Sequence, residues 1–288
     1  MKPAPFAYTA PTELEGALAL LREHGDEAAV LAGGQSLMPL LALRMTAPKV
    51  LVDINRIEPL RAVGHGGDGL RFGALVRHAE ALRAVRDQVG PAHLLAQALP
   101  HVAHQAIRHR GTVCGSLALA DPAAELPACA VCLEAEIELQ GASGRRFVPA
   151  DAFFEGVYAT ARSVDELVVG VRFPATAPGT RFGFVEVARR HGDYAILGLA
   201  SWARVVDGEV ADCRLVYFGA DERPSVATRT ARTLRGGRLD DPATRARAKE
   251  CALDELTIAP DATYGEGYKR RLAGALLERV VAQWGVAG

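Results

Sequence analysis

The sequence has 288 residues, and its 33 lysines and arginines nearly balance its 34 aspartates and glutamates. A chain of this length and apolar content can build two or three packed units, and its near-zero net charge argues against nucleic-acid binding, which favours a basic excess. No apolar stretch is long enough for a membrane span, no secretory pattern opens the chain, and the five cysteines are an odd number, so we expect a cytoplasmic protein without disulfides.

The first region, residues 1–56, is predicted to contain two helices and two buried strands. ELEGALALLREHG is amphipathic and ends at Gly25, a typical helix terminator. EAAVLAGG is typical of a strand that runs into a Gly-Gly turn, and KVLVDIN predicts a second strand. Between them, SLMPLLALR has helical spacing, with Ser36 as the expected N-cap and Pro39 in the first turn.

The second region, residues 57–174, mixes strands and helices around a glycine-rich stretch. GLRFGAL, EAEIELQ and DELVVGVRFP are predicted strands, and RHAEALRAVRDQV and AHLLAQALPHVA are predicted helices. The glycine-rich stretch is GTVCGSLALADP, Gly111 to Pro122.

The third region, residues 175–288, begins with strands and ends with helices. AILGLASWARVV and EVADCRLVYFGA are β-rich and are joined by Asp207-Gly208, a strong hairpin signal. The helical stretches TRARAKECALDEL and YGEGYKRRLAGALLERVVAQW follow. Strands followed by helices predict a separate α+β domain.

Two glycine-rich turns are candidate phosphate sites. In AVLAGGQSL, the glycines allow close approach of a ligand, and the N–H groups of the following helix favour phosphate oxygens. A plain strand-to-helix turn is the alternative. In the second stretch, Gly111, Thr112, Gly115 and Ser116 are candidates for another anion nest. Two such turns without a Rossmann fingerprint indicate a dinucleotide bound by a less common fold.

Two carboxylates follow the second turn at Asp121 and Glu125. They could accept hydrogen bonds from a ribityl chain, a ribose or the edge of a flavin ring. Alternatively, Asp121 caps a helix with Pro122 in its first turn and Glu125 in the same turn. The two interpretations are compatible.

The cysteines and histidines do not form a metal-binding pattern. Cys129-Ala-Val-Cys132 has no second pair and lies in an apolar run, so both residues are interpreted as buried small hydrophobes, like Cys213 and Cys251. Three loosely clustered histidines are interpreted as polar surface or loop residues: His101, His104 and His109.

A basic turn, Arg189 to Ala195, precedes the hairpin. Its aromatic residue, Tyr194, could lie against a planar ring. The alternative is a charged turn that leads into a core strand.

Taken in order, these segments resemble the FAD-binding medium subunit of molybdenum hydroxylases, the group that includes carbon monoxide dehydrogenase and the flavin domain of xanthine dehydrogenase. The segments that carry the resemblance are Ala32–Leu37, Ile107–Ala128, Phe153-Phe154-x-Gly156, DELVVGVRFP and Arg189–Ala195. Together they extend over nearly the whole chain.

The resemblance implies an α+β protein with the PCMH-type FAD-binding fold. Residues 1–56 and 57–174 would be two α/β subdomains that bind FAD, and residues 175–288 would be a domain like that of the carbon monoxide dehydrogenase flavoprotein, an antiparallel sheet packed with helices. FAD would be held non-covalently, and no catalytic side chain or metal ligand is expected in this chain. The implied contacts to the pyrophosphate are Val30, Leu31, Ala32, Gly33, Gly34, Gln35, Ser36, Leu37, Thr112, Val113, Cys114, Gly115 and Ser116. The implied contacts to the flavin or its ribityl chain are Val102, Asp121, Glu125, Val168 and Tyr194.

The same resemblance implies partner subunits. A large subunit would carry molybdopterin, a small subunit would carry two [2Fe–2S] clusters, and the assembly would be (αβγ)2. This chain would pass electrons from the clusters to an external acceptor such as NAD⁺, a quinone, a carrier or O₂. Relatives usually have glycine where Cys114 stands. If that position requires a positive φ, the cysteine is strained; otherwise the turn accommodates a small side chain.

Two other functions are compatible with parts of the pattern. One is a self-sufficient FAD oxidoreductase of the vanillyl-alcohol oxidase or MurB type, which would require a substrate-binding domain with its own base. The other is a nucleotide-binding regulatory module without turnover. Bound flavin would exclude the module, and co-purifying iron–sulfur and molybdopterin chains would exclude the self-sufficient enzyme.

Overall fold

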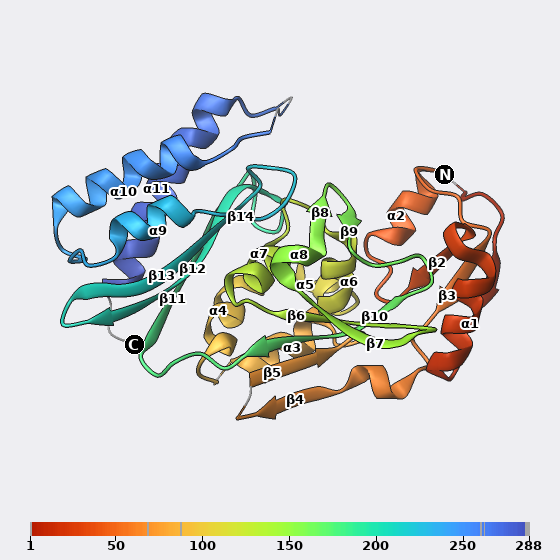
Figure 1. The fold of residues 1–288 in the computed structure, drawn as a ribbon. Coiled ribbons are helices and arrows are strands. Elements are labelled where there is room, and N and C mark those ends of the chain that lie inside the picture. Colours follow the sequence, from red (N-terminus) through yellow and green to blue (C-terminus); the bar gives the residue numbers. More distant parts are fainter. Residues whose placement is uncertain (1, 68, 87, 260, 262, 286–288) are drawn as a thin grey trace.

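The chain folds into three packed parts that follow the order of the sequence. The computed structural model describes residues 2–67, 69–86, 88–259, 261 and 263–285. Figure 1 shows the middle part, coloured brown to green, between the red N-terminal part and the blue C-terminal part. No helix in the described residues is long and apolar enough to cross a membrane.

The N-terminal part is a small parallel sheet with helices. Its elements are β1 (Ala7–Thr9), α1 (Leu14–His24), the 3-10 turn η1 (Gly25–Glu27), β2 (Ala28–Leu31), α2 (Leu37–Ala42) and β3 (Val50–Asp53). The strand order is β1-β3-β2, and both neighbouring pairs are parallel. Gly25 ends α1 with a φ of 50°, as the sequence predicts. The sequence pattern missed β1, because an edge strand of three mostly exposed residues has no apolar alternation.

The middle part is a five-stranded sheet with helices packed on it. Its elements are η2 (Glu58–Arg61), β4 (Val63–Gly66), β5 (Gly69–Gly73), α3 (His78–Val85), α4 (Pro91–Ala98), α5 (Gln105–Arg108), α6 (Val113–Leu119), α7 (Glu125–Cys132), β6 (Glu136–Gly141), β7 (Gly144–Pro149), α8 (Ala150–Phe153), β8 (Phe154–Gly156), β9 (Ala159–Thr160) and β10 (Leu167–Pro174). The order β4-β5-β10-β6-β7 is antiparallel throughout. The predicted strand DELVVGVRFP therefore becomes the central strand β10, whose residues are almost all buried.

The C-terminal part is an antiparallel sheet covered by helices, as predicted. Its elements are β11 (Thr180–Ala188), β12 (Ala195–Val206), β13 (Glu209–Phe218), β14 (Ser225–Val226), α9 (Thr228–Leu234), α10 (Pro242–Glu255) and α11 (Glu266–Gly285). The hairpin between β12 and β13 turns at Asp207 and Gly208, whose φ angles are 51° and 83°. Positive φ at both positions is the geometry of the predicted two-residue turn.

The sheet of the C-terminal part is buried on both faces. Leu197 and Leu199 of β12 belong to a core cluster with buried residues of α9, α10 and α11, whereas Ala200 belongs to the core that includes the middle part. Helices α4 and α7 contact this second face. A strand covered on both sides has a nearly continuous apolar sequence, as AILGLASWARVV has.

Helix α7 connects the middle and C-terminal parts. The indole N–H of Trp202 donates to the carbonyl of Cys132 at 3.0 Å, and Arg214 Nε donates to the carbonyl of Val131 at 3.1 Å. These bonds satisfy carbonyls that a helix end leaves without intrahelical partners. Cys129 and Cys132 lie on this helix with no exposed surface, as the sequence predicts, but Cys251, predicted to be buried, is only partly covered.

Candidate functional site

A cavity of about 650 Å³ reaches all three parts of the molecule. Its lining begins at the end of α1, passes two glycine-rich turns and ends at Gly192, Asp193 and Tyr194, which lie before β12. This volume is within the range of pockets for cofactors, which is roughly 300–1,000 Å³. Residues from all three predicted regions of the chain therefore line this one cavity.

The first glycine turn, residues 32–37, is called here the first loop. Among the described residues, the main-chain N–H groups of Gly33 to Leu37 have no protein acceptor. Gly34 has a φ of 71°, a conformation that glycine adopts without steric cost. Five neighbouring donors without partners beside a cavity form a concave surface suited to an anion.

Ser36 does not cap α2 in the predicted way. It stands at the N-cap position, but its φ and ψ of −96° and −46° are helical, and its side chain makes no capping hydrogen bond. A capping side chain normally requires an extended N-cap residue. The N–H of Leu37, the first residue of α2, thus stays available to a ligand, whereas Met38 donates to the carbonyl of Gly34.

The second glycine turn, residues 111–116, is called here the second loop. Thr112 is the N-cap of α6, and its Oγ1 accepts the N–H of Gly115 at 3.0 Å. A Cβ at position 115 would lie 2.6 Å from that same oxygen, so this cap requires glycine. Val113 N–H donates to Val76, which leaves the N–H of Cys114 without a protein acceptor among the described residues.

The two loops touch through their backbones. A Cβ at Gly33 would lie 2.5 Å from the carbonyl oxygen of Arg110 and 2.7 Å from Cα of Gly111. Real Cβ atoms do not approach backbone this closely, so only glycine allows the contact. The first loop belongs to the N-terminal part and the second to the middle part, so the cavity depends on their packing.

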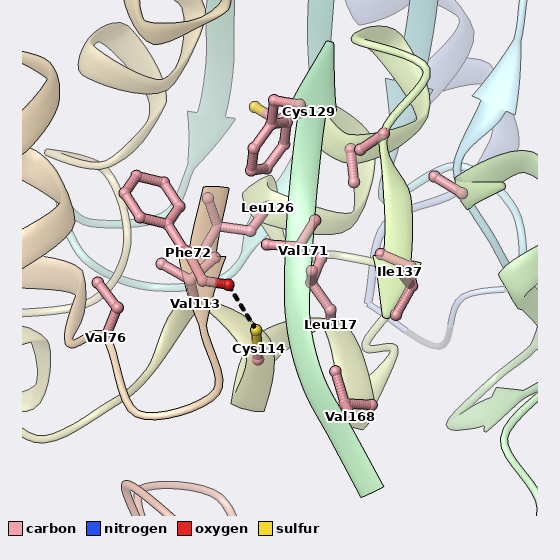
Figure 2. Close-up of a cluster of buried hydrophobic side chains, with 14 of the residues drawn as sticks. Phe72, Val76, Val113, Cys114, Leu117, Leu126, Cys129, Ile137, Val168 and Val171 are labelled. Atoms are coloured by element: carbon pink, nitrogen blue, oxygen red, sulfur yellow. Dashed lines mark hydrogen bonds between the residues drawn. The ribbon is translucent and has the colours of Figure 1, made fainter. Parts of the chain in front are cut away.

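Cys114 is a core residue rather than a reactive thiol. Its backbone is helical, not left-handed, so the strained alternative does not apply. Figure 2 shows its sulfur directed at the carbonyl of Phe72, 3.8 Å away, among the buried side chains near Val168 and Val171. Burial raises the pKa of this thiol to about 12, which removes the thiolate that nucleophilic or metal chemistry requires.

Glu125 is a buried carboxyl group on the cavity wall. It is the first residue of α7 and is 5% exposed. Burial raises its pKa to about 7; the carboxyls of Glu186 and Asp121 add to the rise, while His101 opposes it. This group therefore changes its protonation near neutral pH, unlike an ordinary glutamate.

Asp121 does not cap α7. That helix begins at Glu125 with Ala124 as its N-cap. The carboxylate of Asp121 accepts the N–H of Ala123 at 2.9 Å and the hydroxyl of Tyr158 at 3.2 Å. The residue thus shapes the turn between α6 and α7 instead of starting a helix, because its side chain bonds two residues ahead.

His101 is more than a surface residue. Its Nδ1 lies 3.0 Å from Glu186 Oε1, and that carboxyl side chain is only 5% exposed. The interaction with Glu186 raises the pKa of His101. Glu186 comes from β11 of the C-terminal part, so the charges of both His101 and Glu186 act on Glu125.

The structure brings most of the predicted site residues into one cavity wall. Those that line it are Val30, Ala32, Gly33, Gly34, Gln35, Ser36, Leu37, Val102, Thr112, Cys114, Gly115, Ser116, Glu125, Val168 and Tyr194. Three predicted residues do not line it: Leu31, Val113 and Asp121. Val113 is 1% exposed and faces the core, which explains its absence from the wall. Tyr194, at 57% exposed, presents an open ring.

Sequence reasoning missed the residues that support the loops from behind. Asn55 Nδ2 donates to the carbonyl of Ala32 at 2.8 Å, and the guanidinium of Arg77 donates to the carbonyl of Arg110. His78 lines the cavity next to the second loop. Nothing local marks these residues, because each acts across a long sequence separation.

Comparison with known proteins agrees with this geometry. Residues 4–176 match the family model described as the FAD binding domain in molybdopterin dehydrogenase. Residues 183–284 match the C-terminal domain of the CO dehydrogenase flavoprotein. The two models together extend over nearly all of the chain.

The similarity to individual proteins also extends over the full length. The chain is 36% identical to caffeine dehydrogenase subunit beta of Pseudomonas sp. strain CBB1, with 98% of this chain and 96% of that protein covered. It is 34% identical to the carbon monoxide dehydrogenase medium chain of Hydrogenophaga pseudoflava, with 99% of each covered. Among solved structures, carbon monoxide dehydrogenase from the same organism has a TM-score of 0.92 at 33% identity, and quinoline 2-oxidoreductase from Pseudomonas putida 86 has 0.92 at 35%; each match covers 98% of both chains.

Proposed function

This chain belongs to the family of FAD-binding medium subunits of molybdenum hydroxylases, and from that membership we propose that it takes electrons from the [2Fe–2S] clusters of a partner subunit and passes them to an external acceptor. It is an oxidoreductase subunit that binds FAD. When bound, FAD supplies the ability to exchange one or two electrons, and the protein supplies binding, orientation and electrostatics.

The proposed pyrophosphate site lies where the two loops meet. The open N–H groups of Gly33 to Leu37 would donate to one side of the diphosphate, and the N–H of Cys114 with the hydroxyl of Ser116 to the other. Such arrays bind anions because several main-chain N–H dipoles point toward the same position, and no buried charged side chain is needed. The proposal is carried by two glycine-dependent loops that touch beside one cavity, where the N–H groups of Gly33 to Leu37 and of Cys114 have no acceptor among the described residues.

The proposed flavin end lies beyond the second loop. Val102 and Val168 provide apolar walls, and the exposed ring of Tyr194 provides a flat surface. Glu125 faces the same space and can hold a proton near neutral pH. These residues would orient a planar ring, exclude water from it and keep one ionisable group beside it.

The proposed partners are an iron–sulfur small subunit and a molybdopterin large subunit, in an (αβγ)2 assembly. Relatives carry names such as "medium chain" and "medium subunit", which supports a heteromeric complex. In this arrangement the substrate of the complete enzyme would bind to the large subunit, and this chain would determine only where the electrons go.

The test is purification of the full-length chain from its native host, followed by absorption spectroscopy and analysis of the co-purifying chains. We expect FAD that is released by denaturation, together with subunits that contain [2Fe–2S] clusters and molybdopterin. A protein that stays colourless after incubation with FAD would contradict the proposed site. A flavin-loaded chain that oxidises a substrate without partners would favour the self-sufficient oxidoreductase.

A further inference from the structure

A short segment of the middle part, residues 76–78, runs along the second loop. The N–H of His78 donates to the carbonyl of Gly111 at 3.0 Å, the N–H of Val113 donates to Val76, and Arg77 and Thr112 form an antiparallel bridge. The segment ends where α3 begins, with Arg77 at the N-cap and His78 as the first helical residue. Two adjacent side chains thus lie directly behind the proposed pyrophosphate site.

The guanidinium of Arg77 connects the two loops. One of its nitrogens donates to the carbonyl of Arg110, next to the second loop, and another donates to Oδ1 of Asn55. Asn55 in turn donates to the carbonyl of Ala32, the first residue of the first loop. A planar guanidinium can serve two acceptors at once, which an ammonium group cannot do with the same geometry.

The imidazole of His78 holds the hydroxyl of Ser116. Its Nε2 lies 3.0 Å from Ser116 Oγ, and the residue is 4% exposed. Burial, with the nearby guanidinium groups of Arg108 and Arg77, lowers its pKa to about 4. The ring is therefore neutral at physiological pH and does not act as an anion-binding charge.

The ring also supports the second loop sterically. A Cβ at Gly111 would lie 3.0 Å from the Nδ1 and Cε1 atoms of His78, so ring and loop are in close contact. A hydroxyl group rotates freely unless a partner fixes it. With His78 on one side, Ser116 presents a fixed polar group to the cavity that both residues line.

We propose that Arg77 and His78 are positioning residues for the pyrophosphate of FAD: Arg77 holds the two loops together, and His78 fixes the orientation of the Ser116 hydroxyl. The inference rests on the proposed FAD site. Neither residue touches the phosphates; each acts through a loop that does.

The first test is a double-mutant cycle on His78 and Ser116 in the full-length chain. After removal of bound flavin, FAD is titrated back and the Kd is measured by quenching of flavin fluorescence. His78→Phe keeps the volume of the ring and Ser116→Ala removes the hydroxyl, and we expect each to raise the Kd about tenfold. Because the two side chains act as one unit, the double variant should also be weakened about tenfold rather than about a hundredfold.

The outcomes separate positioning from simple packing. A double variant weakened by the product of the single effects, or a His78→Phe variant with the wild-type Kd, would overturn the role of His78. His93→Phe is the matched control, because His93 packs on Phe182 and does not line the cavity. A wild-type chain that fails to bind FAD would instead contradict the proposed site itself.

The second test concerns Arg77. Arg77→Met should raise the Kd for FAD about tenfold, whereas Arg83→Met, on the exposed side of the same helix, should leave it unchanged. If Arg77→Met does not fold, Arg77→Lys keeps the charge but loses the two-acceptor geometry, and it should weaken FAD binding by a similar factor. Equal Kd values for the Arg83→Met chain and either Arg77 variant would overturn the proposal.

Discussion

The two loops of the cavity use their main-chain donors in opposite ways. In the first loop, the N–H groups of Gly33 to Leu37 have no acceptor in the part of the chain that the structure describes. In the second loop, the N–H groups of Val113 and Gly115 donate to Val76 and Thr112, and among the described residues only those of Thr112 and Cys114 have no acceptor. The second loop is also the more buried, with Thr112 at 2% exposed.

The difference indicates a division of work between the loops. A segment with satisfied hydrogen bonds and a buried cap contributes to the stability of the fold. A segment with open donors contributes to stability only when a ligand satisfies them. We therefore expect changes in the first loop to affect mainly FAD affinity, and loss of the Thr112 cap in the second loop to affect mainly the stability of the apoprotein.

The largest expected effect comes from the point where the loops touch. Gly33→Ala would place a Cβ 2.5 Å from the carbonyl oxygen of Arg110, so the loops must separate. We expect the Kd for FAD to rise by about 100-fold or more, about 2.8 kcal/mol. Flavin titration of the apoprotein measures it, with Gly265→Ala as the control because a Cβ there meets nothing within 4 Å. A wild-type Kd would show that the contact is not needed.

The next largest effect is on the pH dependence of stability and comes from Glu125. This buried carboxyl group follows the second loop, and the first loop has no counterpart. Its folded pKa of about 7 lies above the ordinary 4.5, so the protonated form favours the folded state. This contribution is complete below about pH 4.5 and is lost as the pH rises through 7. Between pH 5 and pH 8 it changes by roughly 2.5 kcal/mol.

Glu125→Gln should remove this dependence, leaving the unfolding free energy flatter with pH than that of the wild type. Denaturant unfolding of the apoprotein from pH 5 to pH 8 measures the difference, and Glu23→Gln, at an exposed carboxyl, should follow the wild type. Parallel curves of unfolding free energy against pH for the wild type and Glu125→Gln would mean that the pKa of this carboxyl group is not raised.

A smaller effect is expected at the N-termini of α6 and α2, one in each loop. Thr112→Val removes the cap of α6 and should destabilise the apoprotein by about 1 kcal/mol, which lowers Tm by about 2–4 °C. Ser36→Ala should leave Tm unchanged, because Ser36 makes no capping bond. Equal losses of Tm in the two variants would break the distinction between the loops.

The smallest effect is expected at Cys114. Cys114→Ala should leave the Kd for FAD within about twofold of the wild type, because the sulfur packs in the core and the substitution keeps the backbone N–H. The folded wild-type chain should also resist labelling of this thiol at pH 8. Loss of FAD from the variant, or rapid labelling, would restore a chemical role for the sulfur.

Much of the architecture could be predicted from local patterns. The hairpin at Asp207-Gly208, the end of α1 at Gly25 and the buried strand β10 all occur where the sequence indicates them. Turn residues and apolar runs act over a few positions, so their signals are local. The strands β1 and β11 and the helix α9 were not predicted, because pairing and packing with distant segments stabilise them.

The chemistry of the candidate site was less predictable. Neither the raised pKa of Glu125 nor the pairing of His101 with Glu186 has a local signal. Each arises from burial and from charges contributed by other parts of the chain. The predicted capping roles of Ser36 and Asp121 were wrong for a related reason. The conformation of the turn around each residue, and not the residue type, determines whether its side chain can cap a helix.

The sequence by itself determined the two glycine turns, one after a strand and one before a helix, and they indicated a dinucleotide ligand, because glycine positions are a property of the chain. Tertiary structure decided which donors stay open and which way Cys114 points. It also decided that Arg77 and His78 lie behind the loops. Hydrogen-bond partners and burial depend on contacts between distant segments, and these exist only once the three parts have packed together.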